Sequence, residues 1–257
     1  MSASAQSVTL SEDLLSDPGI SLNGHRPYIS EWFRHINMLA GQIGPRGSTR
    51  SEEHQAAEYC AREYQRLGLA PQVDRFQSAT SIYLIHTLVS ACMLLSFMLY
   101  PLWGNTGEAL AIILAAVAMF SIVRELLFQN NPLRRLLPRG MSQNVITRIM
   151  PSDEHREDLI LIGHLDTNRT PLLFSSTGWI KAWRVFSSIA FFSFCGQVFL
   201  YTTGIVTHWP WIWPVSSVSA LCAFLLMALT LQAELSAYSP GANDNATGAG
   251  IVLALAR

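Results

Sequence analysis

Four long runs without Asp, Glu, Lys or Arg dominate this sequence. A helix needs roughly 20 apolar residues to cross a hydrocarbon core of about 30 Å. Three of the four runs reach or nearly reach that length, and the second reaches it by extending to Phe128. Soluble cores rarely need uncharged helices this long, so we expect four transmembrane helices rather than buried helices of a soluble protein. The runs are Ile82–Tyr100, Ala109–Val123, Val185–Val206 and Trp209–Ala233.

Short loops join these runs into two hairpins. "PLWGNTGE" joins the first pair, and "THWPWIWP" joins the second pair with tryptophans that suit a bilayer interface. Neither loop contains Lys or Arg, whereas basic residues flank the other ends of the runs. The positive-inside rule then predicts a multi-pass protein of a bacterial inner membrane, with its polar segments in the cytoplasm. The flanking basic residues are Arg62, Arg66, Arg75, Arg134, Arg135, Arg139, Lys181 and Arg184.

Composition supports a membrane protein and argues against a nucleic-acid-binding protein. Charged residues make up 14% of the chain and the mean hydropathy is +0.26, which is too apolar for an ordinary soluble domain. The net charge of -1 provides no basic surface for a phosphate backbone. The four cysteines have neither the paired spacing of a zinc site nor that of a disulfide framework. We therefore expect the lipid bilayer, and no nucleic acid, as a partner.

The polar segments before the first hairpin predict two helices and a strand. Apolar residues three and four apart indicate an amphipathic helix over Ile29–Ile43. A second helix is expected to begin at Ser51, whose hydroxyl would cap it, and to stop at Gly68. Glu52 and Glu53 are interpreted as surface acids that favour the positive end of this helix. "APQVDRF" and, after the hairpin, "QNVITRIM" predict strands.

A further strand and its end carry the first candidate site residues. "DLILIGH" is an almost unbroken apolar run, typical of a strand buried on both faces of an α/β sheet. His164 and Asp166 follow at its carboxyl end, where sites gather in such sheets, and residues two apart in an extended chain point the same way. Taken alone, an H-x-D triplet is more simply explained by a structural or surface role.

The run "SPGANDNATGAG" carries the other candidate, Asp244. It stands before a helical pattern formed by the apolar residues from Ile251 to Leu255. One interpretation is a helix start, in which Asn and Asp side chains cap free amides and the glycines permit left-handed turns. The other is that Asp244 is a metal ligand in a glycine-rich loop. The two interpretations are compatible.

Taken in order, these motifs resemble the two-zinc aminopeptidases of metallopeptidase family 28. The resemblance is carried by "GPRGS", "SEEHQAAEYCAREYQRLGL", "NVITRIMPS", "LILIGHLDT" and "SPGANDNATGAGIVLALAR", and covers the polar segments from about residue 30 onward. It implies that His164 binds zinc, that Asp244 bridges two Zn²⁺ ions, and that Asp166 orients the imidazole. The implied substrate is a peptide or an aminoacyl compound.

Two departures from that family shape the expectations. Each hairpin interrupts the peptidase-like domain, which is tolerable if it leaves and re-enters at neighbouring points. The family's Glu-Glu pair and later ligands, including the glutamate that acts as general base, do not occur before Arg257. Hydrolysis by this chain alone is therefore not expected. The remaining histidines show no ligand spacing and are interpreted as surface or interface residues; they are His25, His35, His54, His86, His155 and His208.

The expected fold is a zinc-exopeptidase-like α/β domain, a mixed sheet flanked by helices, incomplete at its C-terminus and carrying two inserted transmembrane hairpins. The expected function is that of a membrane-anchored, zinc-dependent exopeptidase; the alternative is a non-catalytic, peptidase-like scaffold or binding protein. A small transporter fits less well, because the spans nearly lack ionisable groups. The expected segments are a flexible lead at 1–27, peptidase-like segments at 28–80, 130–178 and 236–257, and hairpins at 81–129 and 179–235.

Overall fold

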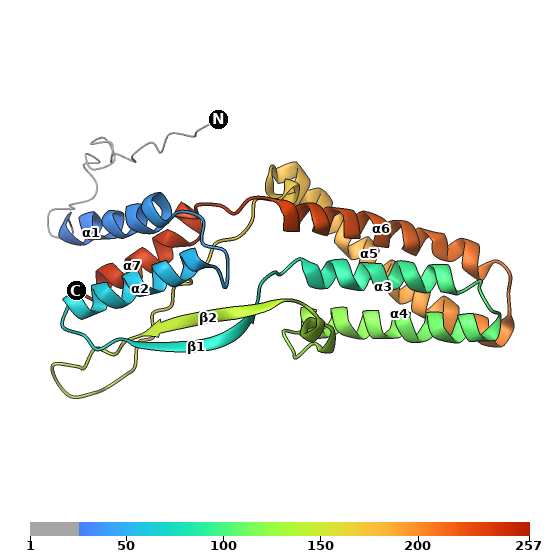
Figure 1. Cartoon of the computed structure of the whole chain (residues 1–257), viewed down its shortest axis with the longest axis horizontal. Coiled ribbons are helices and arrows are strands. Elements are labelled where there is room, and N and C mark those ends of the chain that lie inside the picture. Colours follow the sequence, from blue (N-terminus) through green and yellow to red (C-terminus); the bar gives the residue numbers. More distant parts are fainter. Residues whose placement is uncertain (1–25) are drawn as a thin grey trace. The chain divides into compact units, whose positions relative to one another are not determined.

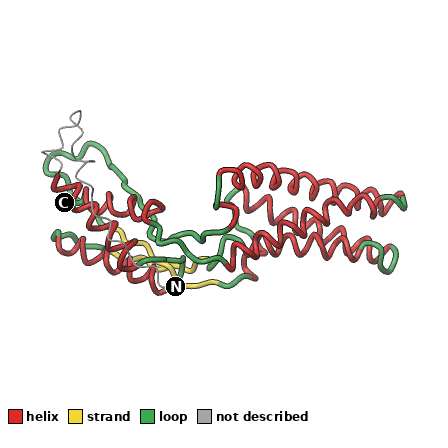
Figure 2. Tube along the Cα trace, turned by 90° about the horizontal axis from the view of Figure 1, so that it is seen from above, coloured by secondary structure: helices red, strands yellow, loops and turns green. Residues whose placement is uncertain are grey.

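The computed structural model describes residues 26–257, so His25 and almost all of the predicted flexible lead, 1–27, lie outside the described residues. The chain divides into two compact units, each formed by segments that are separated in the sequence. We call residues 26–80, 139–169 and 238–257 the polar unit, and residues 81–138 and 170–237 the bundle. Figure 2 shows that helices account for most of the regular structure in both.

The polar unit combines helices with one pair of strands (Figure 1). Its elements are α1 (Arg26–Ile36), η2 (Asn37–Ile43), α2 (Ser51–Arg66), β1 (Gln72–Ala79), β2 (Arg139–Ile146), η5 (Ala242–Ala246) and α7 (Thr247–Leu255). The elements of the bundle are α3 (Leu84–Leu99), α4 (Asn105–Leu126), η3 (Pro132–Leu136), η4 (Leu172–Phe174), α5 (Thr177–Thr207) and α6 (Ile212–Leu235).

The predicted mixed sheet flanked by helices is wrong. Across residues 26–257 the sheet consists of two antiparallel strands, β1 and β2. The "DLILIGH" segment forms no strand, and Leu159, Ile160 and Ile162 are 85%, 77% and 86% exposed. A strand needs neighbours that satisfy its backbone N–H and C=O groups, and no described strand pairs with this segment. An apolar run thus suits a buried strand without being sufficient to form one.

The helix predicted to begin at Ser51 is confirmed as α2, but its start is built differently. Ser51 makes no capping hydrogen bond to the backbone; its hydroxyl contacts Glu52 instead. Glu53 is 5% exposed, so its assignment to the surface was wrong. Its carboxylate accepts hydrogen bonds from the Thr49 amide and, at 2.6 Å, from the Ser142 hydroxyl of β2. The predicted stop at Gly68 is confirmed by its φ of 76°.

Helices α1, α2 and α7 enclose the core of the polar unit. The predicted amphipathic helix is present as α1 continued by η2. His35, which was interpreted as a surface or interface residue, is instead buried, and its Nδ1 lies 2.7 Å from the Tyr59 hydroxyl. Burial raises the pKa of Tyr59 to about 12. The buried apolar cluster contains Leu39, Ala56, Tyr59, Cys60, Tyr64, Ala246, Ala249 and Leu253.

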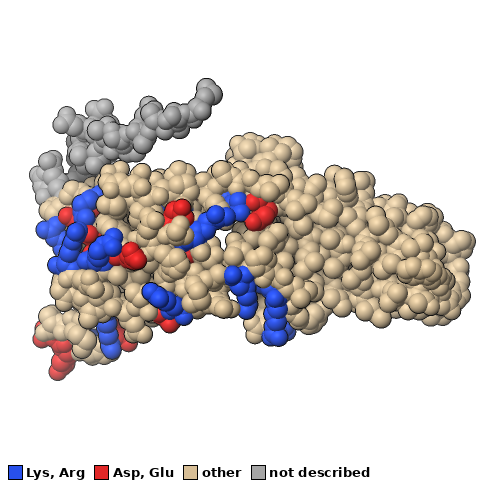
Figure 3. Space-filling model, in the orientation of Figure 1, with Lys and Arg blue, Asp and Glu red and all other residues tan. Residues whose placement is uncertain are grey.

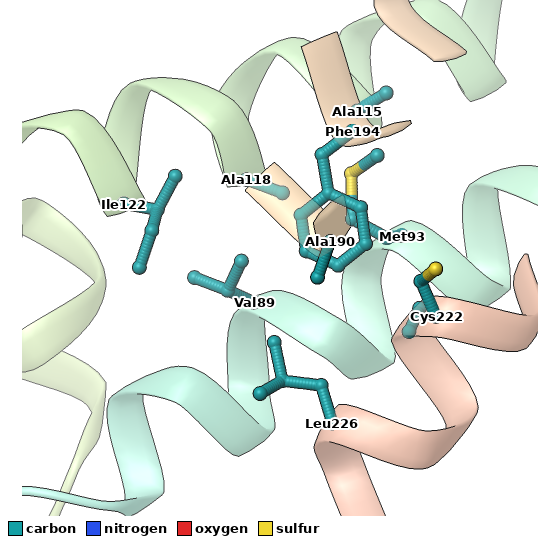
Figure 4. Close-up of a cluster of buried hydrophobic side chains, with 10 residues drawn as sticks. Val89, Met93, Ala115, Ala118, Ile122, Ala190, Phe194, Cys222 and Leu226 are labelled. Atoms are coloured by element: carbon teal, nitrogen blue, oxygen red, sulfur yellow. The ribbon is translucent and has the colours of Figure 1, made fainter. Parts of the chain in front are cut away.

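The bundle packs helices α3, α4, α5 and α6 around a core rich in small side chains. Helix α3 contacts α4 and α6, and α5 also contacts α4 and α6. Figure 4 shows Phe194 of α5 and Met93 of α3 among alanines from α4 and α5. Small side chains let helices approach closely, which favours their association in a membrane. Beside this core, buried Gln197 of α5 donates to the Met93 carbonyl at 3.2 Å and accepts from the Ser219 hydroxyl of α6 at 2.6 Å.

Three helices, α4, α5 and α6, are long and apolar enough to cross a membrane, so the prediction of four such helices is wrong. The first predicted span forms α3, a helix of 16 residues, or about 24 Å at 1.5 Å per residue. It begins at Leu84, where the Ser81 hydroxyl accepts from the Tyr83 and Leu84 amides at 3.0 and 3.3 Å. It ends just before Pro101, which cannot continue a helix.

The outer surface of the bundle is apolar. Figure 3 shows that much of its visible face carries neither acidic nor basic side chains. Contiguous apolar surface of this size marks a membrane or protein contact. Together with the length of its helices, it makes the chain a membrane protein suited to a lipid bilayer. Outward-facing side chains include Ile113, Phe120, Phe192, Phe199 and Val218.

Both hairpins start and finish at neighbouring residues of the polar unit, as expected. The first leaves after β1 and returns at β2, and the register pairs Ala79 with Arg139. The second leaves after Arg169 and returns at Tyr238, and these two residues form an isolated antiparallel bridge. The polar unit can therefore form from three separate segments, because paired residues close each gap.

Candidate metal centre

The structure brings the three sequence-predicted site residues together. His164 Nε2 lies 3.3 Å from Asp244 Oδ1, although the two residues are 80 positions apart. On the other side of the ring, Nδ1 lies 3.2 Å from Asp166 Oδ1 and 3.1 Å from the Asp166 carbonyl oxygen. Both ring nitrogens therefore face oxygen acceptors, Asp166 at Nδ1 and Asp244 at Nε2.

A tight turn presents Asp244 to the imidazole. Gly241 has a φ of 65°, and a Cβ at this position would lie 2.2 Å from the Thr167 side chain, so both backbone conformation and space favour glycine. The Ala246 amide donates to the Gly241 carbonyl at 2.9 Å and closes the turn. Asp244 and Asn245 inside it have non-helical dihedral angles and are joined by a cis peptide bond. The side-chain amide of Asn245, through Nδ2, donates to the His164 carbonyl at 3.4 Å.

The Asp244 carboxylate does not cap the following helix. Helix α7 has Ala246 at its N-cap, and no side chain there makes a capping hydrogen bond. The side chain of Asp244 is 70% exposed and its recorded ion-pair partner is His164. The helix-start interpretation, in which the Asp244 side chain caps free amides, is therefore not supported by the geometry.

The segment with His164 and Asp166 is held against the polar unit by close backbone contacts. A Cβ on Gly163 would come within 2.9 Å of the Ala249 backbone in α7, so glycine permits this approach. The Thr167 amide donates to the Arg46 carbonyl at 2.7 Å, and the Ser239 amide donates to the Asn168 carbonyl at 2.9 Å. The irregular loop that replaces the expected strand is thus fixed beside the Asp244 turn.

Arg46 is a residue near this centre that sequence reasoning missed. Its side chain is fully buried and donates to main-chain carbonyls on both sides of the site. Burial lowers the pKa of Arg46 from its ordinary value, while the charges of Cys60 and Asp166 act in the opposite direction. The only signal in the sequence is an arginine inside the turn-forming stretch "GPRGS", which gives no indication of burial.

The two candidate donor atoms, His164 Nε2 and Asp244 Oδ1, are of types that bind zinc. An imidazole nitrogen and a carboxylate oxygen are common zinc ligands. Two ligands on one tetrahedral zinc, at bond lengths of about 2.0–2.2 Å, stand about 3.3–3.5 Å apart. The 3.3 Å between His164 Nε2 and Asp244 Oδ1 matches that spacing and exceeds the roughly 2.7–2.9 Å of a charge-assisted hydrogen bond. Within residues 26–257, no group of three or more His, Cys, Asp or Glu side chains could hold a metal ion.

The remaining described histidines lie apart from this pair. His155 is an exposed residue whose Nε2 lies 3.0 Å from Asp158 Oδ1, and His208 pairs with Glu108 in the bundle.

Comparisons of the chain with protein-family models, curated proteins and solved structures found no match.

Proposed function

We propose that this chain belongs to a membrane-anchored, zinc-dependent exopeptidase, and that His164 and Asp244 are two of its metal ligands. The observation that carries the proposal is the 3.3 Å approach of His164 Nε2 to Asp244 Oδ1, with Asp166 on the opposite side of the ring. The resemblance to the aminopeptidases of metallopeptidase family 28 supplies the substrate class, a peptide or aminoacyl compound. The mixed-sheet fold of that family forms no part of the proposal.

The residues of this chain would hold and orient the metal. Asp166 accepts the Nδ1 proton of His164 and so fixes the tautomer in which Nε2 can bind zinc. Asp244 would add a negative charge that partly neutralises the ion. Zinc in such a site polarises the scissile carbonyl and lowers the pKa of a bound water. The family places the general base on a glutamate that this chain does not contain.

Zinc binding by the full chain in detergent or nanodiscs tests the proposal. We expect one or two Zn²⁺ per chain, measured by chelator competition after removal of free metal. His164→Ala and Asp244→Asn should each weaken zinc binding by more than the roughly 10- to 100-fold typical of a lost outer-shell partner, because each removes a ligand.

The matched control is His155→Ala, since His155 is another exposed histidine beside a carboxylate, Asp158, in the same unit. It should leave zinc affinity unchanged. Equal zinc affinity in the parent chain, His164→Ala and Asp244→Asn would rule out this centre.

An activity assay separates the enzyme from the non-catalytic scaffold. The chain alone should show no zinc-dependent hydrolysis of aminoacyl substrates, since it lacks the glutamate general base of the family. If the protein is an enzyme, a longer version of the chain that extends past residue 257 and carries this glutamate should hydrolyse these substrates. Absence of hydrolysis by a longer chain that binds zinc through His164 and Asp244 would favour the scaffold.

A further inference from the structure

Arg46 is fully buried, which is unusual for an arginine. A buried charge is tolerated when hydrogen bonds replace its lost hydration, and a guanidinium has five N–H donors to place. Arg46 Nε donates to the Leu165 carbonyl at 2.8 Å, and Nη1 donates to the Gly44 and Pro240 carbonyls at 2.7 and 3.0 Å. Nη1 also contacts the Leu39 carbonyl, and Nη2 lies 3.5 Å from the Gly241 carbonyl.

Three of these five acceptors, the carbonyls of Leu165, Pro240 and Gly241, lie in the two segments that carry the candidate metal ligands. Leu165 stands between His164 and Asp166, whereas Pro240 and Gly241 begin the turn that presents Asp244. One side chain therefore contacts the backbone on both sides of the centre.

The backbone of Arg46 adds two hydrogen bonds to the first of these segments. Its amide donates to the Thr167 hydroxyl at 2.9 Å, and its carbonyl accepts from the Thr167 amide at 2.7 Å. The Thr167 side chain in turn leaves no room for a Cβ on Gly241. The loop with Arg46, the His164 segment and the Asp244 turn are thus mutually constrained.

We propose that Arg46 is a positioning residue that sets the spacing of His164 and Asp244 by holding their two backbone segments through carbonyl hydrogen bonds. This inference rests on the proposed function for its metal, but the ordering of the two segments can be measured without metal. Lysine cannot replace this arginine, because its three donors sit on one nitrogen and cannot span separated carbonyls.

The first experiment measures hydrogen exchange of the metal-free, full-length chain. We expect Arg46→Lys and Arg46→Met to increase exchange at least 10-fold in peptides that cover 163–169 and 239–247. Protection of the β1 and β2 amides should persist, which shows that the polar unit is still folded. If Arg46→Met also loses the β-strand protection, the milder Arg46→Lys decides the question.

The matched control is Arg34→Met, the same chemical change in the same unit. Arg34 binds the carboxylates of Glu31 and Glu63 instead of the carbonyls beside the centre. It should leave exchange in both site segments within 2-fold of the parent.

The second experiment measures affinity for zinc and the visible absorption spectrum of the Co²⁺-loaded chain. Arg46→Lys should weaken zinc binding about 10- to 100-fold, as loss of an orienting partner does. It should also shift the Co²⁺ absorption bands, because the ligand geometry changes. Arg34→Met should retain the parent affinity and spectrum.

The outcomes separate this inference from the proposed function. Zinc binding through His164 and Asp244 that is unaffected in both Arg46 variants, with unchanged exchange in both segments, would overturn the positioning role alone. If the parent chain binds no zinc, the proposed function is wrong. If the Arg46 variants then still show the expected increase in hydrogen exchange, the role of Arg46 in ordering the two segments is supported.

Discussion

The two ring nitrogens of His164 face two carboxylates, and in the proposed centre Asp166 orients the ring whereas Asp244 binds the metal. Asp166 is two residues away in the chain, so its proximity to the ring follows from local geometry. Asp244 reaches Nε2 through a turn that depends on Gly241, and that turn is visible in the sequence as a glycine- and asparagine-rich run. The proximity of these three side chains was predictable because each belongs to a short motif in the sequence.

Arg46 was not predictable for the opposite reason. The carbonyls of Leu165 and Pro240 that it binds lie 119 and 194 residues away in the chain. Main-chain carbonyls are present at every residue, so the sequence gives no sign of which ones an arginine will meet. The burial of Glu53 was missed likewise, because its partner Ser142 belongs to a distant strand.

The buried His35 predicts a pH dependence of stability. Burial first, and then the charge of Arg34, lower the pKa of His35 below its ordinary value of 6.5, while Glu63 and Glu31 oppose this shift. The unfolded chain therefore binds a proton at His35 more readily than the folded chain. Stability is fully present above pH 6.5 and is lost as the pH falls through that value.

Thermal unfolding of the polar unit should accordingly show a lower midpoint at pH 5.5 than at pH 7.5. His35→Gln keeps a hydrogen-bonding group near Tyr59 but cannot take up a proton, so it should reduce that difference. The exposed His155 serves as the control, and His155→Gln should leave the difference unchanged. An equal pH dependence in His35→Gln and the parent would contradict the assignment.

At the level of elements, residue patterns located most helices, and for α2 they also located both ends. Apolar spacing located α1 and α7, start and stop signals at Ser51 and Gly68 located α2, and β-branched content located β2, because each of these signals lies within or beside the element itself. The first uncharged run was correctly predicted as a helix, but α3 is shorter than the predicted span, since its ends depend on Ser81 and Pro101 rather than on the uncharged length. The "DLILIGH" segment, residues 158–164, was wrongly predicted as a strand because pairing requires neighbouring strands that local sequence does not reveal.

Gln197 predicts how the helices of the bundle are coupled. Its amide bonds to α3 through the Met93 carbonyl and to α6 through the Ser219 hydroxyl. Hydrogen bonds between membrane helices contribute on average about 0.6 kcal/mol and at most about 1.7 kcal/mol. Gln197→Leu should therefore lower the free energy of unfolding in detergent by about 1–2 kcal/mol.

Equilibrium unfolding by added SDS measures this change. Phe199→Leu is the control on the same helix, because Phe199 is 71% exposed on the outer surface, and it should alter stability by less than about 0.5 kcal/mol. A Gln197→Leu bundle as stable as the parent would show that these hydrogen bonds contribute nothing net.

For the whole molecule, the distribution of Lys and Arg predicts an orientation. Basic residues flank the bases of the hairpins and are missing from both connecting loops, so the loops should face outward and the polar unit the cytoplasm. Single cysteines at Asn105 and His208 should react with a membrane-impermeant maleimide on intact spheroplasts, whereas one at Asp153 should react only after permeabilisation. All three positions are exposed in the fold. Labelling of Asp153→Cys without permeabilisation would reverse the orientation.

Ala79 pairs with Arg139, and Arg169 pairs with Tyr238, so each hairpin could be deleted without separating the residues that flank it. Since the two cut ends already lie next to each other, a tight turn of a few residues is long enough to replace a whole hairpin. For the same reason, the topology of the polar unit would allow the two hairpins to have been inserted one at a time into an ancestral chain. Replacing both hairpins at these points would give a version of the polar unit that can be studied without detergent.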